Sequence, residues 1–319
     1  MKAPTAPATT MARKPNTRAV TDGSAVGGTV GEPVVMGSGD DASAGVVEAP
    51  GSASISLHRM HLEWPAVKAL VVLPTYNEAE NILIVLGLVR EHVPHAEVLV
   101  VDDGSPDGTA DLAEQWAVDH DGGVSVLRRS EKSGLGSAYR AGFGWGLEHG
   151  FEILIEMDSD LQHDPAMLPA LIHAIEDGAD LCIGSRYAPG GSVPGWKWSR
   201  RLISQGGNIY AAMVLGMHVR DSTAGFRAYA APAVAKLELD EVKADGYGFQ
   251  IEMAYAVGRN GGRIVEVPIA FGSRQRGASK MSSFIVFEAL AMVTWWGIRD
   301  RVLFRGRRAP TTKSDLPEA

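Results

Sequence analysis

Short apolar runs alternate with longer amphipathic segments from Ala66 onward, a pattern that predicts strands and helices in turn. We expect strands at residues 67–73, 97–101, 124–128, 153–157, 181–184 and 264–271. We expect helices at residues 78–92, 110–119, 137–149, 167–177, 200–215, 246–258 and 284–304. Such alternation is typical of an α/β fold with a Rossmann-like, mostly parallel sheet flanked by helices. Pro268 interrupts the last strand and favours an edge position for it.

The two ends of the chain do not share this pattern. Residues 1–55 are dominated by Ala, Gly, Pro, Ser, Thr and Val, without a sustained period, so we expect a disordered tail. The basic residues in this tail are not followed by the apolar stretch of a signal peptide. We therefore expect a globular domain at residues 56–283, an amphipathic helix at 284–306 and a second disordered tail at 307–319.

Composition narrows the classes of function. A net charge of −8 argues against a general nucleic-acid binder, which would usually be basic. The single cysteine, Cys182, lies in an apolar run and is expected to be a buried strand residue, and it excludes a disulfide within the chain.

The segment 284–304 includes charged residues and is not expected to cross a membrane. Trp295 and Trp296 beside Arg299 and Arg301 suit a helix that lies on a membrane surface, although an ordinary packed helix remains open.

Two carboxylates follow the predicted strand 153–157 directly. Asp158 and Asp160 are two residues apart, so in an extended backbone they face the same way. Together with the amide oxygen of Gln162, they can hold a hard divalent cation, Mg²⁺ or Mn²⁺. A polar turn without metal has the same sequence pattern, so neighbouring loops must decide between the two readings.

Two further loops are expected at the same edge of the sheet. Residues 74–78 follow the first strand and residues 102–109 follow the second. Asn77, which we expect to open the first helix, is a good helix cap, as are Ser105 and Asp107. Tyr76 offers a flat face to a nucleobase, while Glu78 and Asp103 offer acceptors to ring N–H or ribose hydroxyl groups.

These motifs together resemble family 2 glycosyltransferases of GT-A fold, and within them the dolichol- or polyprenol-phosphate mannosyltransferases. The resemblance covers residues 67–283 and rests on six segments, which are Leu73–Glu78, Val101–Thr109, Gly134–Gly136, Asp158–His163, Gly184–Tyr187 and Asp221–Arg227. It implies an inverting, metal-dependent transfer of mannose from GDP-mannose to a polyprenyl phosphate.

The resemblance also implies roles for individual residues. It implies GDP-mannose contacts at Pro74, Tyr76, Glu78, Val101, Asp103, Asp158, Ser159, Asp160, Arg186, Arg274 and Lys280. It implies metal ligands at Asp158, Asp160 and Gln162, with Ser159 replacing the Ala common in that motif. His163 is left as a flanking residue, because hard cations prefer oxygen ligands.

A lipid phosphate brought to a nucleoside diphosphate has to be met by fixed cations. Arg186, Arg200 and Ser204 are our candidates for the lipid phosphate, alongside Arg274 and Lys280 near the diphosphate. Because a phosphate is already ionised near neutral pH, no general base is needed, and Asp158, Asp160 and Arg186 are expected to act by charge and alignment. The segment 273–280, rich in small residues, is expected to be a mobile lid.

Two other functions remain open at the level of sequence. One is transfer of glucose or another hexose from a UDP-sugar to polyprenyl phosphate or a polysaccharide end, and the other is a nucleotide-sugar-binding module without turnover. We expect the protein to work at the cytoplasmic face of a membrane as a peripheral protein, through its last helix or through a membrane-embedded partner.

Overall fold

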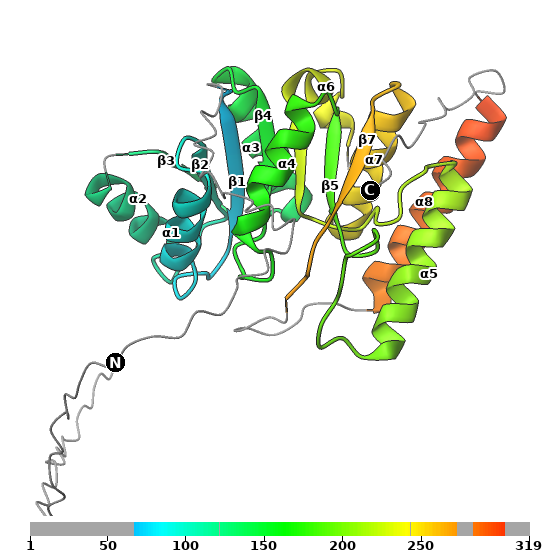
Figure 1. Ribbon diagram of the computed structural model, residues 1–319, viewed down its shortest axis with the longest axis horizontal. Helices are drawn as coiled ribbons and strands as arrows, with labels where there is room; N and C mark the ends of the chain where they lie inside the picture. The colour runs from blue at the N-terminus through cyan, green and yellow to red at the C-terminus, as the bar shows by residue number, and fades with distance from the viewer. Residues whose placement is uncertain (1–66, 121, 243, 273–282, 304–319) are drawn as a thin grey trace, which may run out of the picture. The chain divides into compact units, whose positions relative to one another are not determined.

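The computed structural model describes residues 67–120, 122–242, 244–272 and 283–303 (Figure 1). Its centre is a seven-stranded sheet in the order β3-β2-β1-β4-β6-β5-β7. The strands are β1 (Ala69–Thr75), β2 (Glu97–Asp102), β3 (Val124–Arg128), β4 (Ile153–Glu156), β5 (Leu181–Ser185), β6 (Arg227–Ala230) and β7 (Ile264–Pro268). All pairings are parallel except those of β6, which runs antiparallel to both β4 and β5. The predicted α/β fold with a mostly parallel sheet is confirmed.

The central strands are apolar on both faces because helices cover both sides of the sheet. Along β1, Val71 and Leu73 pack on one face with α1, α2 and α4, while Leu70 and Val72 pack on the other with α3, α6 and α7. The helices are α1 (Ile82–His92), α2 (Thr109–Asp119), α3 (Leu135–Glu148), α4 (Leu168–Glu176), α5 (Trp198–Leu215), α6 (Ala231–Ala235), α7 (Gly246–Arg259) and α8 (Ser283–Leu303). Short 3₁₀ turns lie at η1 (Pro165–Met167) and η2 (Leu239–Glu241).

Two expectations about these elements were wrong. The first helix begins at Ile82 and not at residue 78, because Asn77 has a left-handed backbone (φ 60°) and the next residues form a turn. Strand β6 was missed, since no strand was expected between residues 184 and 264. Its four residues are too few for a period, and only pairing with β4 and β5 makes them a strand. Cys182 is fully buried in β5, as expected.

Helices α5, α7 and α8 share a third apolar core beside the sheet. Ala211 and Leu215 of α5 meet Ile251 of α7 and Val293 and Trp296 of α8. Trp296 was expected at a membrane surface, but it is 7% exposed and belongs to this core, whereas Trp295 is 63% exposed. Within the described residues, no helix combines the length and apolar character needed to cross a bilayer.

Helix α3 approaches β1 closely at Gly142. A Cβ atom built at Gly142 collides with Cγ1 of Val72, a fully buried β-branched side chain that has no room to turn away. At Gly144 on the same helix, a Cβ atom meets nothing within 4 Å.

We expect Gly142→Ala to lower the free energy of unfolding by about 1–3 kcal/mol, because an added methyl overpacks the interface. The measurement is the midpoint of chemical denaturation. Gly144→Ala is the matched control and should be neutral or stabilising by up to about 1 kcal/mol, since alanine favours a helix. Equal effects of the two substitutions would contradict this account of the packing.

Candidate active site

The predicted site residues follow the carboxyl ends of β1, β2, β4 and β5, which lie at one edge because these strands are parallel. Along the chain, the sheet grows from β1 toward β2 and β3 and then resumes on the other side with β4. Ligands of open α/β sheets bind outside the strands at such a reversal. The loops after β1 and β4 therefore frame the candidate active site.

The loop after β1 is fixed by the loop after β2. Asp102, 2% exposed, accepts hydrogen bonds from Thr75 Oγ1 (2.8 Å) and from the backbone N–H (2.8 Å) and Oγ (2.6 Å) of Ser105. The backbone N–H groups of residues 77–79 each donate at 3.0 Å to side-chain oxygens of the second loop, those of Ser105, Thr109 and Asp107. Ser105 and Asp107 were expected to cap a helix. Asp107 does accept the backbone N–H of Thr109, the first residue of α2, at 3.1 Å, and both side chains also hold the neighbouring loop.

These two loops and the strand ends before them contain five of the eleven residues expected to contact the nucleotide-sugar. Lys132 Nζ lies over the Tyr76 ring, 4.2 Å from its centre, so this cation covers one face of the ring. Glu78 accepts a hydrogen bond from Asn81 Nδ2 (2.8 Å). The side chain of Val101 is fully buried in the core, so it is not available to a ligand.

Asp103 is almost buried and faces a cation. Its Oδ1 lies 3.4 Å from Nε of Arg129, and its Oδ2 accepts the backbone N–H of Ser133 at 3.3 Å. The interaction ties the loop after β2 to the segment that precedes α3. Any ligand that reaches this carboxylate meets an acceptor whose charge Arg129 already offsets.

Asp158, Asp160 and Gln162 follow β4, which ends at Glu156. Residues 159–161 form a bend, so Asp160 lies outside the regular strand that the sequence pattern assumed. Leu161 has a left-handed backbone (φ 62°), and Asp160 Oδ1 accepts the backbone N–H of Gln162 at 3.1 Å. Gln162 Nε2 donates to the backbone oxygen of Gly272 (3.0 Å), which fixes the side-chain amide.

Two hydrogen bonds position Asp158, one to its side chain and one from its backbone. Tyr139, fully buried in α3, donates a hydrogen bond from its hydroxyl to Asp158 Oδ1 (3.1 Å). The backbone N–H of Asp158 donates to Nδ1 of His163 at 3.2 Å. Burial lowers the pKa of His163 to about 4, so its ring is neutral near pH 7 and can accept at Nδ1. His163 thus positions Asp158, in keeping with its expected flanking place.

A buried carboxyl, that of Glu156, lies at the end of β4, two residues before Asp158. Glu156 is fully buried in β4, opposite Arg227 of β6 in the strand register. Burial raises the pKa of Glu156 to about 7, although Arg227 opposes the shift. This carboxyl therefore carries less than a full negative charge near neutral pH and adds little to the charge of Asp158 and Asp160.

These residues suit a hard divalent cation by the chemistry of their donors. Asp158 and Asp160 supply carboxylate oxygens and Gln162 supplies an amide oxygen, the ligands that Mg²⁺ and Mn²⁺ prefer. Among the described residues, no group of three or more His, Cys, Asp or Glu side chains is arranged for a metal. The donor set is therefore two carboxylates with an amide, and not a closed cage of charged ligands.

Arg186 belongs to a buried ion pair. Its Nη2 and Nε lie 2.6 Å and 2.7 Å from the carboxylate oxygens of Asp221, which is fully buried, and Nη2 also donates to Thr223 Oγ1 at 2.8 Å. Burial lowers the pKa of Arg186, but the hydrogen bonds to Asp221 outweigh it and the pKa is raised. Within the described part of the chain, Nη1 is the Arg186 side-chain nitrogen that makes no hydrogen bond.

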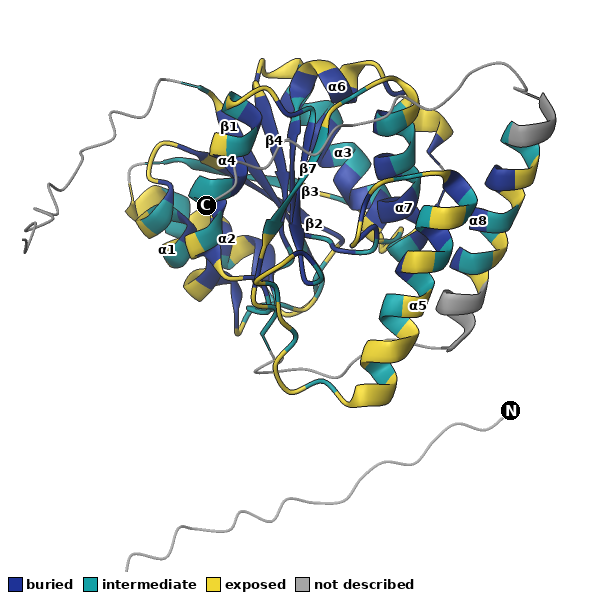
Figure 2. Cartoon of the chain, turned by 45° about the vertical axis from the view of Figure 1, so that its right-hand side comes forward, coloured by how far each residue is buried: buried dark blue, intermediate teal, exposed yellow. Residues whose placement is uncertain are grey.

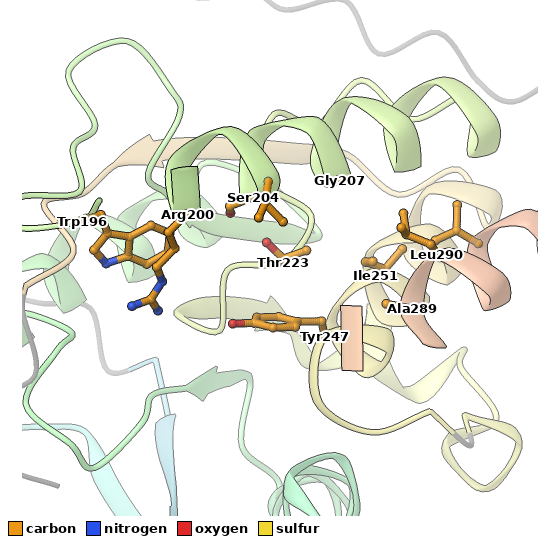
Figure 3. Close-up of a pocket in the computed structure, with 11 residues that line it drawn as sticks. Trp196, Arg200, Ser204, Gly207, Thr223, Tyr247, Ile251, Ala289 and Leu290 are labelled. Carbon is orange, nitrogen blue, oxygen red and sulfur yellow. The ribbon is translucent and has the colours of Figure 1, made fainter. Parts of the chain in front are cut away.

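An apolar cavity of about 570 Å³, a volume that includes its open mouth, lies between α5, α7 and α8 (Figure 3). Ile251, Ala289, Leu290 and Val293 line its apolar part. Arg200, Ser204, Trp196, Thr223 and Tyr247 line the polar part, and the Tyr247 hydroxyl points toward the end with Arg200 and Trp196 (Figure 3). The guanidinium carbon of Arg200 lies 3.8 Å from the centre of the Trp196 ring. The structure thus brings the predicted Arg200 and Ser204 together at a single cavity.

The loop between Asp221 and Arg227 joins this cavity to the carboxylates. Thr223 lines the cavity and bonds Arg186, while a Cβ atom at Gly225 would lie 3.8 Å from Asp158 Oδ2. Because Gly225 has no side chain, the space beside Asp158 stays clear. The apolar cavity, which Thr223 lines, and the space beside Asp158, which Gly225 borders, are therefore only two residues apart along this loop.

Arg274 and Lys280, with the expected lid at 273–280, lie outside the described residues. Sequence reasoning missed Tyr139, Tyr247, Trp196 and Thr223 as parts of the site. Tyr139 and Tyr247 lie in helices that read as ordinary packing segments, and no spacing signal relates them to Asp158 or Arg200. Two signals were available, which are the run of tryptophan and basic residues around Trp196 and the place of Thr223 in the motif Asp221–Arg227.

Comparison with known proteins decides the family. The model of glycosyl transferase family 2 matches residues 70–237. The chain belongs to glycosyl transferase family 2. This glycosyltransferase is 49% identical over 243 residues to a protein of Micrococcus luteus named undecaprenyl-phosphate mannosyltransferase, covering 76% of this chain and 98% of the relative. It is 47% identical over 238 residues to polyprenol monophosphomannose synthase of Mycolicibacterium smegmatis, covering 75% and 90%.

A solved structure shares the fold of this glycosyltransferase. Glucosyl-3-phosphoglycerate synthase of Mycobacterium tuberculosis, solved with Mn²⁺, UDP and glucosyl-3-phosphoglycerate, superposes with a TM-score of 0.52 at 21% identity. The superposition covers 74% of this chain and 80% of the solved chain. The likeness concerns the arrangement of strands and helices.

The buried pair between Arg186 and Asp221 generates a prediction for this glycosyltransferase. Asp221→Asn should lower the free energy of unfolding by about 3–5 kcal/mol, because it leaves Arg186 buried without its counter-charge. Asp111→Asn is the matched control, since Asp111 pairs with Arg128 at 2.5 Å on the surface and its side chain is 77% exposed. Chemical denaturation should shift for Asp221→Asn and stay nearly unchanged for Asp111→Asn. Similar midpoints for both variants would count against a structural ion pair.

Proposed function

We propose that this glycosyltransferase transfers mannose from GDP-mannose to a polyprenyl phosphate with inversion at the sugar. The observation that carries the proposal is the apolar cavity whose polar end contains Arg200, Ser204 and Tyr247. This cavity lies close to the carboxylates, because Thr223 lines it and Gly225, two residues later, borders the space beside Asp158. An acceptor with an anionic head and an apolar chain matches this combination. The names of the two relatives, undecaprenyl-phosphate mannosyltransferase and polyprenol monophosphomannose synthase, support the same acceptor and sugar.

The donor would lie across the loops after β1, β2 and β4. We propose that Pro74, Tyr76, Glu78, Asp103 and Ser159 contact the nucleotide-sugar, with Val101 contributing through its backbone alone and Arg274 and Lys280 adding cations. Ser159 Oγ donates to the backbone oxygen of Pro74 at 3.1 Å, so two of these loops are already joined. Asp158, Asp160 and Gln162 would hold Mg²⁺ or Mn²⁺. When bound, such a cation neutralises charge on the diphosphate leaving group.

The acceptor phosphate would meet Arg186, Arg200 and Ser204. Arg186 is held rigidly by Asp221, so its remaining Nη1 can donate to an anion without first being ordered. Arg200 lies against Trp196 and has a buried Nε without a hydrogen bond in the described structure. Because the acceptor is already an anion, its oxygen attacks the sugar carbon without proton removal, and alignment with the leaving group is the main task of the protein.

We further propose that the enzyme works as a peripheral protein at the cytoplasmic face of a membrane, where a polyprenyl phosphate and a nucleotide-sugar meet. A membrane-embedded partner protein would be compatible with this placement. No nucleic acid is involved in the proposed reaction.

The deciding experiment incubates the full chain with polyprenyl phosphate, Mg²⁺ or Mn²⁺, and radiolabelled GDP-mannose or UDP-glucose in parallel, followed by organic extraction. We expect label in the lipid phase from GDP-mannose, with a β-linked product from an α-linked donor. Asp158→Asn should lower the rate about a hundredfold or more, and Asp119→Asn at the end of α2 is the control. Label from UDP-glucose alone would reassign the donor, and none from either would indicate a binding module.

The hydrogen bond from Tyr139 to Asp158 gives a second test. Tyr139→Phe should weaken Mn²⁺ binding in the presence of GDP by about tenfold, because groups that orient a metal ligand contribute to affinity on that scale. Isothermal titration calorimetry measures the affinity directly. Tyr255→Phe is the control. It removes the hydroxyl of a tyrosine in α7 that donates to Asp300 of α8 at 2.6 Å, and it should leave Mn²⁺ binding unchanged. An unchanged affinity in Tyr139→Phe would mean that Tyr139 does not orient a ligand.

A further inference from the structure

Helix α5 carries an apolar stripe on its outer side. Trp198, Leu202, Ile209 and Met213 are 75%, 57%, 59% and 66% exposed. Their spacing of four, seven and four residues places them on one side of the helix, and Gly206, also exposed, lies between them. The opposite side of α5 contributes Ala211 and Leu215 to the core (Figure 2). Gln205 is the polar residue on this side, between Leu202 and Ile209. A folded protein seldom exposes four large apolar side chains on one side of a helix without a partner.

The segment of sequence that contains this stripe is basic in an otherwise acidic protein. No Asp or Glu occurs between Asp180 and Asp221, although the whole chain has a net charge of −8. Lys197 and Arg201 are exposed at the N-terminal end of α5, next to Trp198. Tryptophan, aliphatic residues and flanking cations on one helix are the features of a helix that binds an anionic lipid surface.

The stripe is continuous with the cavity. Ile203 is 57% exposed and also lines the cavity beside Arg200 and Ser204. The surface of α5 therefore leads directly to the polar end of the cavity. A lipid whose chain remains in a bilayer could reach this end without crossing water.

We propose that the outer side of α5, defined by Trp198, Leu202, Ile209 and Met213 with Lys197 and Arg201, rests on the headgroup region of an anionic phospholipid bilayer. This inference rests on the proposed function, because it explains how the enzyme reaches an acceptor embedded in a membrane. It moves the docking surface from α8, where sequence reasoning had placed it, to α5. Helix α8 contributes an exposed Trp295 and Ile298, but its Trp296 is committed to the core.

A second copy of the chain fits the same surface less well. A symmetric pair formed through α5 would bring two copies of the same basic segment together, without an acidic residue from that segment to offset them. Anionic headgroups supply the missing charge, and the acyl region accommodates the tryptophan and aliphatic side chains.

The test is flotation of the full chain with vesicles of phosphatidylcholine containing phosphatidylglycerol, compared with vesicles of phosphatidylcholine alone. The wild-type chain should bind the anionic vesicles more strongly. Leu202→Asp should lower the partition coefficient about tenfold or more, since it removes an inserted aliphatic side chain. Arg201→Gln should lower it about fivefold on the anionic vesicles only. Val118→Asp, at a 76% exposed apolar residue of α2, is the matched control and should bind as wild type.

Three results of the binding and association measurements would overturn the proposal. Unchanged vesicle binding in both Leu202→Asp and Arg201→Gln would show that α5 is not the docking surface. A dimer in analytical ultracentrifugation that Leu202→Asp dissociates would assign the stripe to a second copy. Binding to native membranes but not to protein-free vesicles would assign it to a membrane protein.

A water-soluble short-chain prenyl phosphate separates this inference from the proposed function. With that acceptor, Leu202→Asp should transfer mannose at the wild-type rate, whereas with a long-chain acceptor in vesicles it should be slower. If the wild-type chain binds anionic vesicles through α5 but glycosylates neither acceptor, the proposed function fails and the docking surface stands. If Leu202→Asp is equally slow with the soluble acceptor, its defect is not one of docking, and the inference fails.

Discussion

Parallel pairing of β1 with β2 on one side and β4 on the other is the constraint on which the candidate site depends. It forces the loops after all three strands to leave the sheet at one edge. Side-chain to backbone hydrogen bonds then turn this proximity into fixed geometry, with Asp102 at the centre of the first two loops and Ser159 joining the third to Pro74. Many of the polar residues that the sequence offers as candidates for binding or catalysis therefore hold the loops together. Fewer of them remain available to a ligand.

Helices and strands were predictable from the sequence where the periodic pattern of apolar residues extended over enough positions. The strands at 97–101 and 181–184 and the helices from α2 to α5 were placed within a few residues, because burial imposes a regular pattern on them. The pattern failed at Asn77, where side chains of the neighbouring loop bind the backbone and delay the helix to Ile82. It failed again at β6, whose four residues become a strand only through their neighbours.

The site was predictable in its motifs and much less so in its contacts. The acids after β4 and the cations at Arg186 and Arg200 follow strand ends or a helix start, which sequence reveals. That Asp221 binds Arg186, and that Tyr139 reaches Asp158 from α3, depends on the packing of segments far apart in the chain. A single sequence has no signal for such pairs, because each partner taken alone has an ordinary local explanation.

The reversed direction of β6 has a consequence for how the site is built. A strand that runs antiparallel starts where its neighbours end, so the residues that precede β6 arrive at the same edge as the residues that follow β4 and β5. The segment from Asp221 to Gly225 thereby becomes a partition between two compartments, with one surface toward the carboxylates and the other toward the apolar cavity. An all-parallel sheet would have needed another crossover to supply that wall. One reversed strand of four residues supplies it, and places the carboxylates and the apolar cavity on opposite sides of one short loop.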